Sequence, residues 1–123
     1  MSDARVSDIA AYKNEIRKQA HANRNDQKNK DKLSDHITDR FMSLAEYEAA
    51  AVVMFYVDVR SEVRTRNKLA TALGGPQAIV IPYCVDGELE LFLLEDMNEL
   101  EIGMYKILEP KESLRDLPEK RVL

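Results

Sequence analysis

The stretch Ala51-Val-Val-Met-Phe-Tyr-Val57 decides the fold class, because it is a short, continuous apolar run rich in Val and aromatic residues. Such a run is typical of a strand that is covered on both faces, as in a parallel sheet. The sequence then predicts a helix from Thr65 to Leu73, closed by Gly74-Gly75-Pro76, and a second apolar strand from Ala78 to Pro82. Strand, helix and strand in this order predict a parallel crossover unit and therefore an α/β fold.

Two helices are predicted before this unit and one more strand after it. Apolar residues recur at three- and four-residue steps from Ser7 to Asn23 and again from Leu33 to Leu44, which is helical spacing. The polar stretch from Ala22 to Lys32 is predicted to connect them. Asp86-Gly87 is a tight-turn signal, so Leu89 to Leu94 should pair with the preceding strand as a hairpin.

Length and composition are those of one domain spanning residues 1–123. The chain has 45% hydrophobic and 33% charged residues, and its formal net charge of -4 argues against a protein that coats nucleic acid. No run of about 18 apolar residues and no segment like a signal peptide is present, so we expect no membrane span and a cytoplasmic protein. Cys84 is the single cysteine, which excludes an internal disulfide and a cysteine metal cluster.

Three short signatures follow one another in a fixed order: Lys13-Asn-Glu-Ile-Arg17, then Met54 to Thr65, then Ile107-Leu-Glu-Pro110. In this order they resemble the N-terminal part of the 5-formyltetrahydrofolate cyclo-ligase family, also called 5,10-methenyltetrahydrofolate synthetase. The resemblance implies a three-layer α/β/α domain with a largely parallel central sheet, preceded by the two N-terminal helices. Members of the family continue into a Gly-Arg-Gly-x-Gly-Tyr-Tyr-Asp phosphate loop that this sequence does not contain. We therefore expect an incomplete domain, equivalent to the N-terminal half to two-thirds of a cyclo-ligase.

Lys13 and Arg17 are four residues apart and should project from one face of the first helix. Arginine supplies a planar fork of donors and lysine a point charge, and a nucleotide triphosphate can use both kinds of contact. The resemblance implies that this pair binds ATP. The alternative is a solvated helix face with no ligand.

Glu62 follows the apolar strand and precedes the next helix. Ligands of parallel sheets bind beyond the carboxyl ends of the strands, where a carboxylate can accept hydrogen bonds from a heterocycle. The resemblance implies that Glu62 contacts folate and that Val57 lies in the same pocket. The alternative for Glu62 is an acid that complements the helix dipole. Arg64 replaces an acid or small polar residue that is usual in the family, so the local charge balance is an open question.

Tyr105 precedes the third signature, where the family has an aromatic residue, and it could stack on the folate rings or pack beneath a loop. Lys106 stands where the family commonly has glycine, so we expect less access to a positive φ. His21 and His36 have no second ligand at metal spacing, which predicts no zinc site. Cys84 follows a strand and is expected to be a small buried residue.

The resemblance implies an ATP-dependent reaction that closes 5-formyltetrahydrofolate into 5,10-methenyltetrahydrofolate, with ATP and Mg²⁺ as cofactors. ATP is thought to phosphorylate the formyl oxygen before the second folate nitrogen attacks. Because the glycine-rich loop is missing from the sequence, the alternative is a catalytically incomplete folate- or nucleotide-binding module or a partner subunit. Self-association, or a second polypeptide that completes the site, would follow from an uncovered sheet edge.

Overall fold

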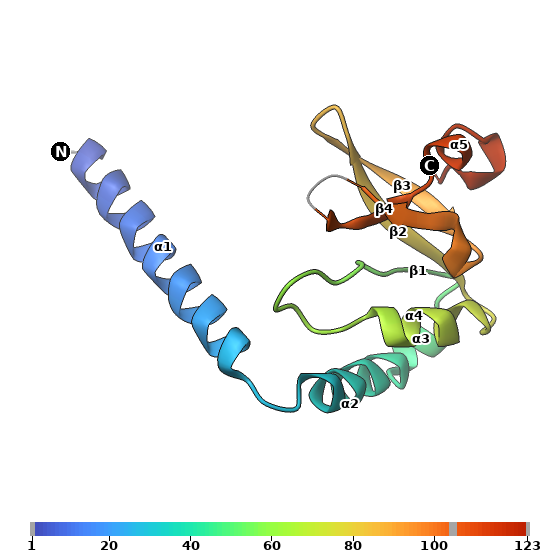
Figure 1. The fold of residues 1–123 in the computed structure, drawn as a ribbon, viewed down its shortest axis with the longest axis horizontal. Coiled ribbons are helices and arrows are strands. Elements are labelled where there is room, and N and C mark those ends of the chain that lie inside the picture. The colour runs from blue at the N-terminus through green and yellow to red at the C-terminus, as the bar shows by residue number, and fades with distance from the viewer. Residues whose placement is uncertain (1, 104–105, 123) are drawn as a thin grey trace.

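The computed structural model describes residues 2–103 and 106–122, with side chains from residue 7 onward (Figure 1). Its helices are α1 (Ser2–Asp26), α2 (Lys30–Met42), α3 (Ala45–Ala49), α4 (Arg66–Leu73) and α5 (Glu112–Arg115), with 3-10 turns η1 (Met97–Glu99) and η3 (Pro118–Lys120). Its strands are β1 (Val52–Met54), β2 (Ala78–Val85), β3 (Glu88–Leu94), β4 (Leu100–Ile102) and β5 (Leu108–Pro110). The predicted order of helices, strand, helix, strand and hairpin strand is confirmed, with two differences. The short helix α3 between α2 and β1 was not predicted, and the strand predicted over residues 51–57 covers only Val52–Met54.

The main sheet has the order β1-β2-β3. β1 pairs in parallel with β2, with Val53 opposite Ile79, as the crossover prediction requires. β2 and β3 pair antiparallel across a turn in which Asp86 and Gly87 have φ values of 51° and 80°, which suits a two-residue hairpin. β4 and β5 form a separate antiparallel pair. The described residues therefore form a mixed α/β fold, in which the parallel pairing is that of β1 with β2.

The prediction that the first strand is covered on both faces is wrong. Val53 is buried, but Val52 and Met54 on the opposite face are 52% and 59% exposed. β1 pairs only with β2 among the described strands, so it is an edge strand, and the face that carries Val52 and Met54 is largely open to solvent. A continuous apolar run shows that a strand is hydrophobic, but it does not show which of its two faces other elements cover.

The core lies between the buried face of the sheet and helices α3 and α4, which lie beside α2 below the sheet in Figure 1. Leu69 of α4 and Ile81 of β2 are fully buried, as is Phe92 of β3. Cys84 is exposed, contrary to expectation. Successive residues of a strand point to opposite faces, and Tyr83 beside it takes the buried position.

Helix α1 projects away from the rest of the molecule (Figure 1). It is longer than predicted, so the connection to α2 shrinks to residues 27–29 and turns at Asn29, whose φ is 59°. Every residue from 7 to 26 is exposed, including Tyr12 at 69%. The helical spacing of the apolar residues is thus confirmed, but α1 packs its apolar stripe against nothing in the described chain. None of the described helices is long and apolar enough to cross a membrane.

Candidate functional site

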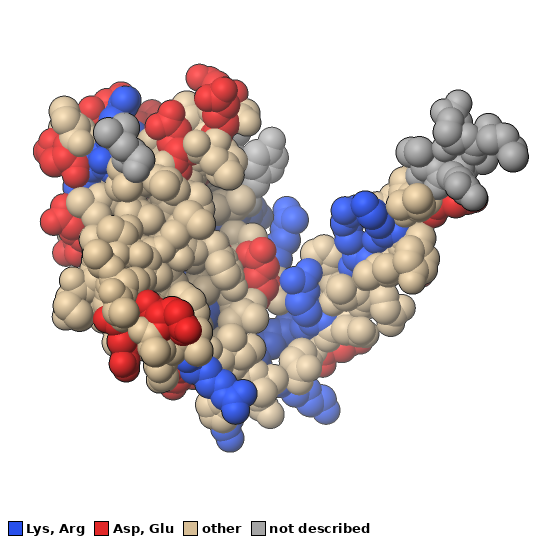
Figure 2. All heavy atoms as spheres, turned by 180° about the vertical axis from the view of Figure 1, so that it is seen from behind, with Lys and Arg blue, Asp and Glu red and all other residues tan. Residues whose placement is uncertain are grey.

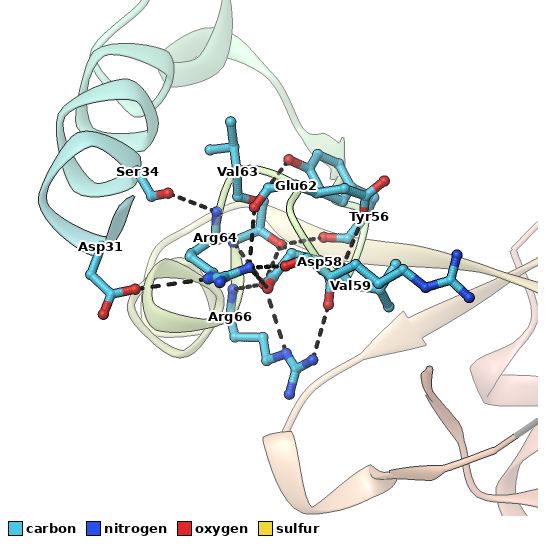
Figure 3. A network of polar contacts seen from close by, with 11 residues as sticks. Asp31, Ser34, Tyr56, Asp58, Val59, Glu62, Val63, Arg64 and Arg66 are labelled. Carbon is cyan, nitrogen blue, oxygen red and sulfur yellow. Dashed lines mark hydrogen bonds and ion pairs between the residues drawn. The ribbon is translucent and has the colours of Figure 1, made fainter. Parts of the chain in front are cut away.

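The loop between β1 and α4 is organised around the carboxylate of Asp58, which is 3% exposed (Figure 3). Its Oδ1 accepts the backbone N–H groups of Thr65 at 2.9 Å and Arg66 at 3.0 Å. The Thr65 hydroxyl donates to the carbonyl of Tyr56 at 2.7 Å. An anion at the first N–H groups of a helix satisfies unpaired donors and complements the helix dipole. Asp58 therefore fixes the start of α4 against the end of the first strand.

Arg64 ties this loop to α2. Its backbone N–H donates to the hydroxyl of Ser34 at 2.8 Å, and Ser34 is buried. The guanidinium of Arg64 lies 3.9 Å from Asp58 and 3.8 Å from Asp31 (Figure 3). The charge that departs from the family pattern is therefore balanced by two aspartates.

Glu62 closes the turn at the tip of the loop. Its Oε1 accepts the N–H of Val59 at 3.0 Å, and its own N–H donates to the Val59 carbonyl at 3.1 Å. The role of an acid at the start of α4 is taken by Asp58, so that alternative for Glu62 finds no support. Glu62 lines a cavity of about 250 Å³, together with residues from the end of α1 and from α2 such as Arg24 and Leu33.

An apolar cavity of about 350 Å³ lies beside the Glu62 cavity, since both are lined by Ile37 and Val63. Tyr56 lines it, and its hydroxyl donates to the Val63 carbonyl at 2.9 Å. Burial raises the pKa of Tyr56, and the negative charges of Glu62 and Asp58 raise it further. Tyr56 therefore stays protonated near neutral pH and keeps this donor role. Two hollows thus lie side by side, and the Glu62 cavity has charged side chains, Glu62 and Arg24, in its lining.

Lys13 and Arg17 are exposed on α1, and Arg17 donates to the side chain of Asn14 at 3.2 Å. Arg24 follows them on the same helix face and lines the Glu62 cavity. At 1.5 Å per residue, Arg17 and Lys13 lie about 10 Å and about 16 Å from Arg24 along the helix axis. Figure 2 shows Lys and Arg side chains of α1 gathered on its side toward the body. The pair is therefore aligned with the cavity but is not in contact with it.

The remaining predicted site residues lie elsewhere. Val57 is half-buried and packs against the core, and it is not among the residues that line the Glu62 cavity. Tyr105 lies outside the described residues. The expectation for Lys106 is wrong, because it adopts a positive φ of 60° in place of the family's glycine.

A comparison with known protein families gives the family of this chain. The model of the 5-formyltetrahydrofolate cyclo-ligase family matches residues 9–122, which is nearly the whole chain. The chain belongs to this family. The match includes the first signature, the β1–α4 loop and the third signature, so the cyclo-ligase resemblance in the sequence is confirmed.

A solved structure gives the same result for the fold of this cyclo-ligase family member. The NMR structure of 5,10-methenyltetrahydrofolate synthetase from Aquifex aeolicus superposes with a TM-score of 0.73 at 24% sequence identity. The alignment covers 81% of this chain and 52% of that one, so this chain spans about half the length of the structure it matches. No curated protein sequence matches the chain.

Sequence reasoning missed the polar residues that build the loop of this cyclo-ligase relative, Asp58 above all. The available signal was an acid at the end of an apolar run, seven residues before the helix-starting Thr65. Arg24 was missed as well, although it continues the Lys13 and Arg17 face of α1 by two helical turns. Neither signal identifies the residues that the side chain contacts. The contact of Asp58 with Arg64, for example, depends on how the loop folds back in three dimensions.

Proposed function

We propose that this chain provides the folate-binding loop and part of the ATP-binding surface of a 5-formyltetrahydrofolate cyclo-ligase. The observation that carries the proposal is the family match over residues 9–122, which includes Glu62 at the edge of a cavity bounded by α1. The proposed reaction is the ATP-dependent closure of 5-formyltetrahydrofolate to 5,10-methenyltetrahydrofolate. The proposed fold of the whole enzyme is a three-layer α/β/α domain with a largely parallel sheet, of which residues 1–123 form one part in the cytoplasm.

The folate would bind where the Glu62 cavity adjoins the apolar cavity beside Tyr56. Glu62 uses Oε1 to hold Val59, and its second oxygen has no hydrogen bond within the described chain. That oxygen can accept N–H groups of a pterin, while the apolar hollow beside Tyr56 suits a ring. Val57 and Tyr105 remain proposed members of this pocket on the resemblance alone.

ATP would bind along α1. Lys13 and Arg17 are exposed cations on one face, which fits the requirement of a phosphate chain for several donors. No group of three or more His, Cys, Asp or Glu side chains in the described residues could hold a metal ion. We therefore propose that Mg²⁺ arrives with the nucleotide phosphates. ATP supplies the phosphoryl group that activates the formyl oxygen, and the chain's own residues position the substrate and neutralise charge.

The folate proposal is tested with Glu62→Gln. Glutamine keeps an oxygen that can accept the Val59 N–H but removes the charge, so the loop should stay folded while 5-formyltetrahydrofolate binds about 10-fold more weakly. Titration calorimetry measures the affinity, and circular dichroism checks the fold. Glu62→Ala serves as the comparison, because it also removes the bond to Val59. Equal affinity of Glu62→Gln and the wild-type chain would overturn the role of Glu62.

The ATP proposal is tested with the double variant Lys13→Ala and Arg17→Ala. Loss of two cations should weaken binding of a non-hydrolysable ATP analogue about 10-fold or more at low salt. Lys18→Ala is the control for each of the two single variants, since it also removes one exposed charge but from a different side of α1. A similar loss in the control would indicate only general charge attraction.

A second candidate is a folate- or nucleotide-binding module without catalysis, which is equally consistent with the family match over residues 9–122. The methenyl product has its own ultraviolet absorbance, so turnover is directly measurable. Binding of both ligands without product would support the module, and product formation would support the enzyme. Sedimentation measurements with both ligands present would show whether the chain self-associates.

A further inference from the structure

Two hollows lie side by side at the β1–α4 loop and share Arg60 and Arg66 in their lining. The first, of about 440 Å³, also contains two acids, Asp31 and Asp58. The second, of about 530 Å³, is lined by Val59, Arg60, Arg66 and Lys106. It therefore combines three cations with one apolar residue and includes no acid among its lining residues, although the chain as a whole has a net charge of -4.

The three cations of the second hollow differ in how they are held. Arg66 is anchored, because its Nη2 donates to the carbonyl of Asp58 at 3.0 Å and its Nε lies 3.7 Å from the Asp58 carboxylate. Arg60 and Lys106 are exposed, and neither side chain forms an ion pair within residues 7–103 and 106–122. One fixed guanidinium and two available charges thus face the same space.

The backbone under both available cations is unusual. Arg60 has a φ of 52° and Lys106 a φ of 60°, a left-handed conformation that residues with a Cβ rarely adopt. At Arg60 this conformation is held from within the loop, since the Arg60 carbonyl accepts a hydrogen bond from Arg64 Nη1 and Glu62 closes the turn on Val59. Strained residues that the surrounding structure maintains tend to gather at ligand sites. Four described non-glycine residues have a positive φ: Asn29 and Asp86 lie in turns, and the other two are the available cations of this hollow.

We propose that the hollow lined by Arg60, Arg66 and Lys106 binds an oxyanion that carries several negative charges. Guanidinium forks match the oxygens of phosphate and carboxylate groups, and the lysine adds a third positive charge. The inference goes beyond the proposed folate and ATP contacts, which use Glu62, Lys13 and Arg17. Both phosphate and carboxylate fit this chemistry, so the test includes one probe of each.

The probes are inorganic tripolyphosphate and citrate, titrated into the full chain by calorimetry at low salt. We expect at least one to bind, with the tighter probe identifying the group, and we expect raised salt to weaken binding. Arg60→Gly and Lys106→Gly remove the cations where glycine suits the backbone, so each should preserve the fold. Each should weaken the tighter probe about 5-fold, and the double variant about 20-fold or more.

Two controls distinguish binding in this hollow from general charge attraction and from binding along α1. Arg40→Ala removes an exposed charge of α2 outside the hollow, so it should change the affinity less than about 2-fold. The double variant Lys13→Ala and Arg17→Ala tests the proposed ATP contacts. The probes could bind and lose affinity only in the Lys13→Ala and Arg17→Ala double variant. In that case the probes bind along α1, so the inference is overturned and the proposed ATP contacts are supported. Failure of both probes to bind would also overturn the inference, and it would leave the folate test with Glu62→Gln unaffected.

Discussion

Lys120 and Arg60 carry the same charge in different surroundings. Lys120 is 7% exposed, and its ammonium lies 2.7 Å from Glu95, 2.5 Å from Glu99 and 3.4 Å from the carbonyl of Leu93. It also lies 5.4 Å from the centroid of the Phe92 ring. The three protons of the ammonium therefore have three acceptors, and the charge joins η3 to the end of β3 and to η1.

Arg60 and its neighbour Lys106 show the opposite arrangement. Both are exposed, both have left-handed backbones, and neither forms an ion pair within the described part of the chain. The comparison teaches that the number of hydrogen-bond acceptors around a basic side chain distinguishes a cation that stabilises the fold from one that is available to a ligand. The sequence around the two residues contains no such information.

The largest expected effect is that of Lys120→Met, which keeps the apolar stem but leaves Glu99 without its partner. Because the Glu99 side chain is only 13% exposed, we expect the free energy of unfolding to fall by about 3 kcal/mol. Urea denaturation measures it. Arg121→Met is the control, since Arg121 pairs with an Asp116 side chain that is 90% exposed and should contribute about 0.5 kcal/mol or less. Equal losses of stability in the two variants would contradict the claim that the buried ion pair contributes more than the exposed one.

Asp58→Asn should have the next largest effect. The amide oxygen can still accept both helix N–H groups, but the substitution removes the charge that attracts Arg64 and Arg66 and puts an NH₂ donor where Oδ2 faces Arg64. We expect a loss of about 2 kcal/mol, measured by urea denaturation. Asp39→Asn is the control, because Asp39 is 60% exposed and pairs with Lys68 on the surface. A loss no greater than that of the control would mean that Asp58 does not organise the loop.

The elements predicted from sequence were those whose signal is local. The Gly74-Gly75-Pro76 stop predicted helix α4, a continuous apolar run predicted strand β2, and the turn residues Asp86-Gly87 predicted the hairpin, because each signal depends on neighbouring residues only. The exposure of Cys84 and the open face of β1 were not predicted, since both depend on where other elements lie. Composition cannot distinguish an edge strand from a central strand.

The site was predictable only in part. Glu62 was placed beside a cavity by its position after a strand, which is a topological argument. The contacts of Asp58 with Thr65 and Arg66 depend on the path of an irregular loop, which no periodic pattern encodes. The left-handed Lys106 shows the same limit, because the surrounding structure overrides the preference of a single residue.

A smaller effect should appear in the dependence of stability on pH. Burial raises the pKa of Glu99, but Lys120 and the N–H groups of Glu95 and Asp96 outweigh it, so the pKa falls below the ordinary 4.5. The stability from Glu99 is therefore complete above about pH 4.5 and is lost as the pH falls through the lower folded value. Glu99→Gln should cost stability at neutral pH and much less in acid, as urea denaturation at several pH values would show. A constant difference between variant and wild type would contradict this linkage.

Lys120 predicts the corresponding alkaline limb. Burial lowers its pKa, but the hydrogen bonds and charges of Glu95 and Glu99 outweigh it and raise the pKa above the ordinary 10.5. Its contribution is complete below about pH 10.5 and is lost as the pH rises through the higher folded value.

The smallest effect, and the one of opposite sign, is expected for Arg60→Gly. Glycine adopts a φ near 52° without the strain of a Cβ, so the free energy of unfolding should rise by about 0.5 kcal/mol. Arg60→Ala is the matched comparison, because it removes the same charge but keeps the Cβ. Thermal unfolding should give a higher midpoint for glycine than for alanine. A lower midpoint for glycine would mean that the arginine side chain stabilises the fold.

The exposure of α1 has a consequence for amide hydrogen exchange. A helix without packed neighbours keeps its hydrogen bonds only through its own helix–coil equilibrium, so its amides should exchange with solvent far faster than those of the central strand β2. A ligand that joins Lys13 and Arg17 to the body would have to supply the missing order. Protection would then spread along Ser2–Asp26 while β2 exchanged as before, and the affinity of that ligand would already include the free energy of ordering the helix.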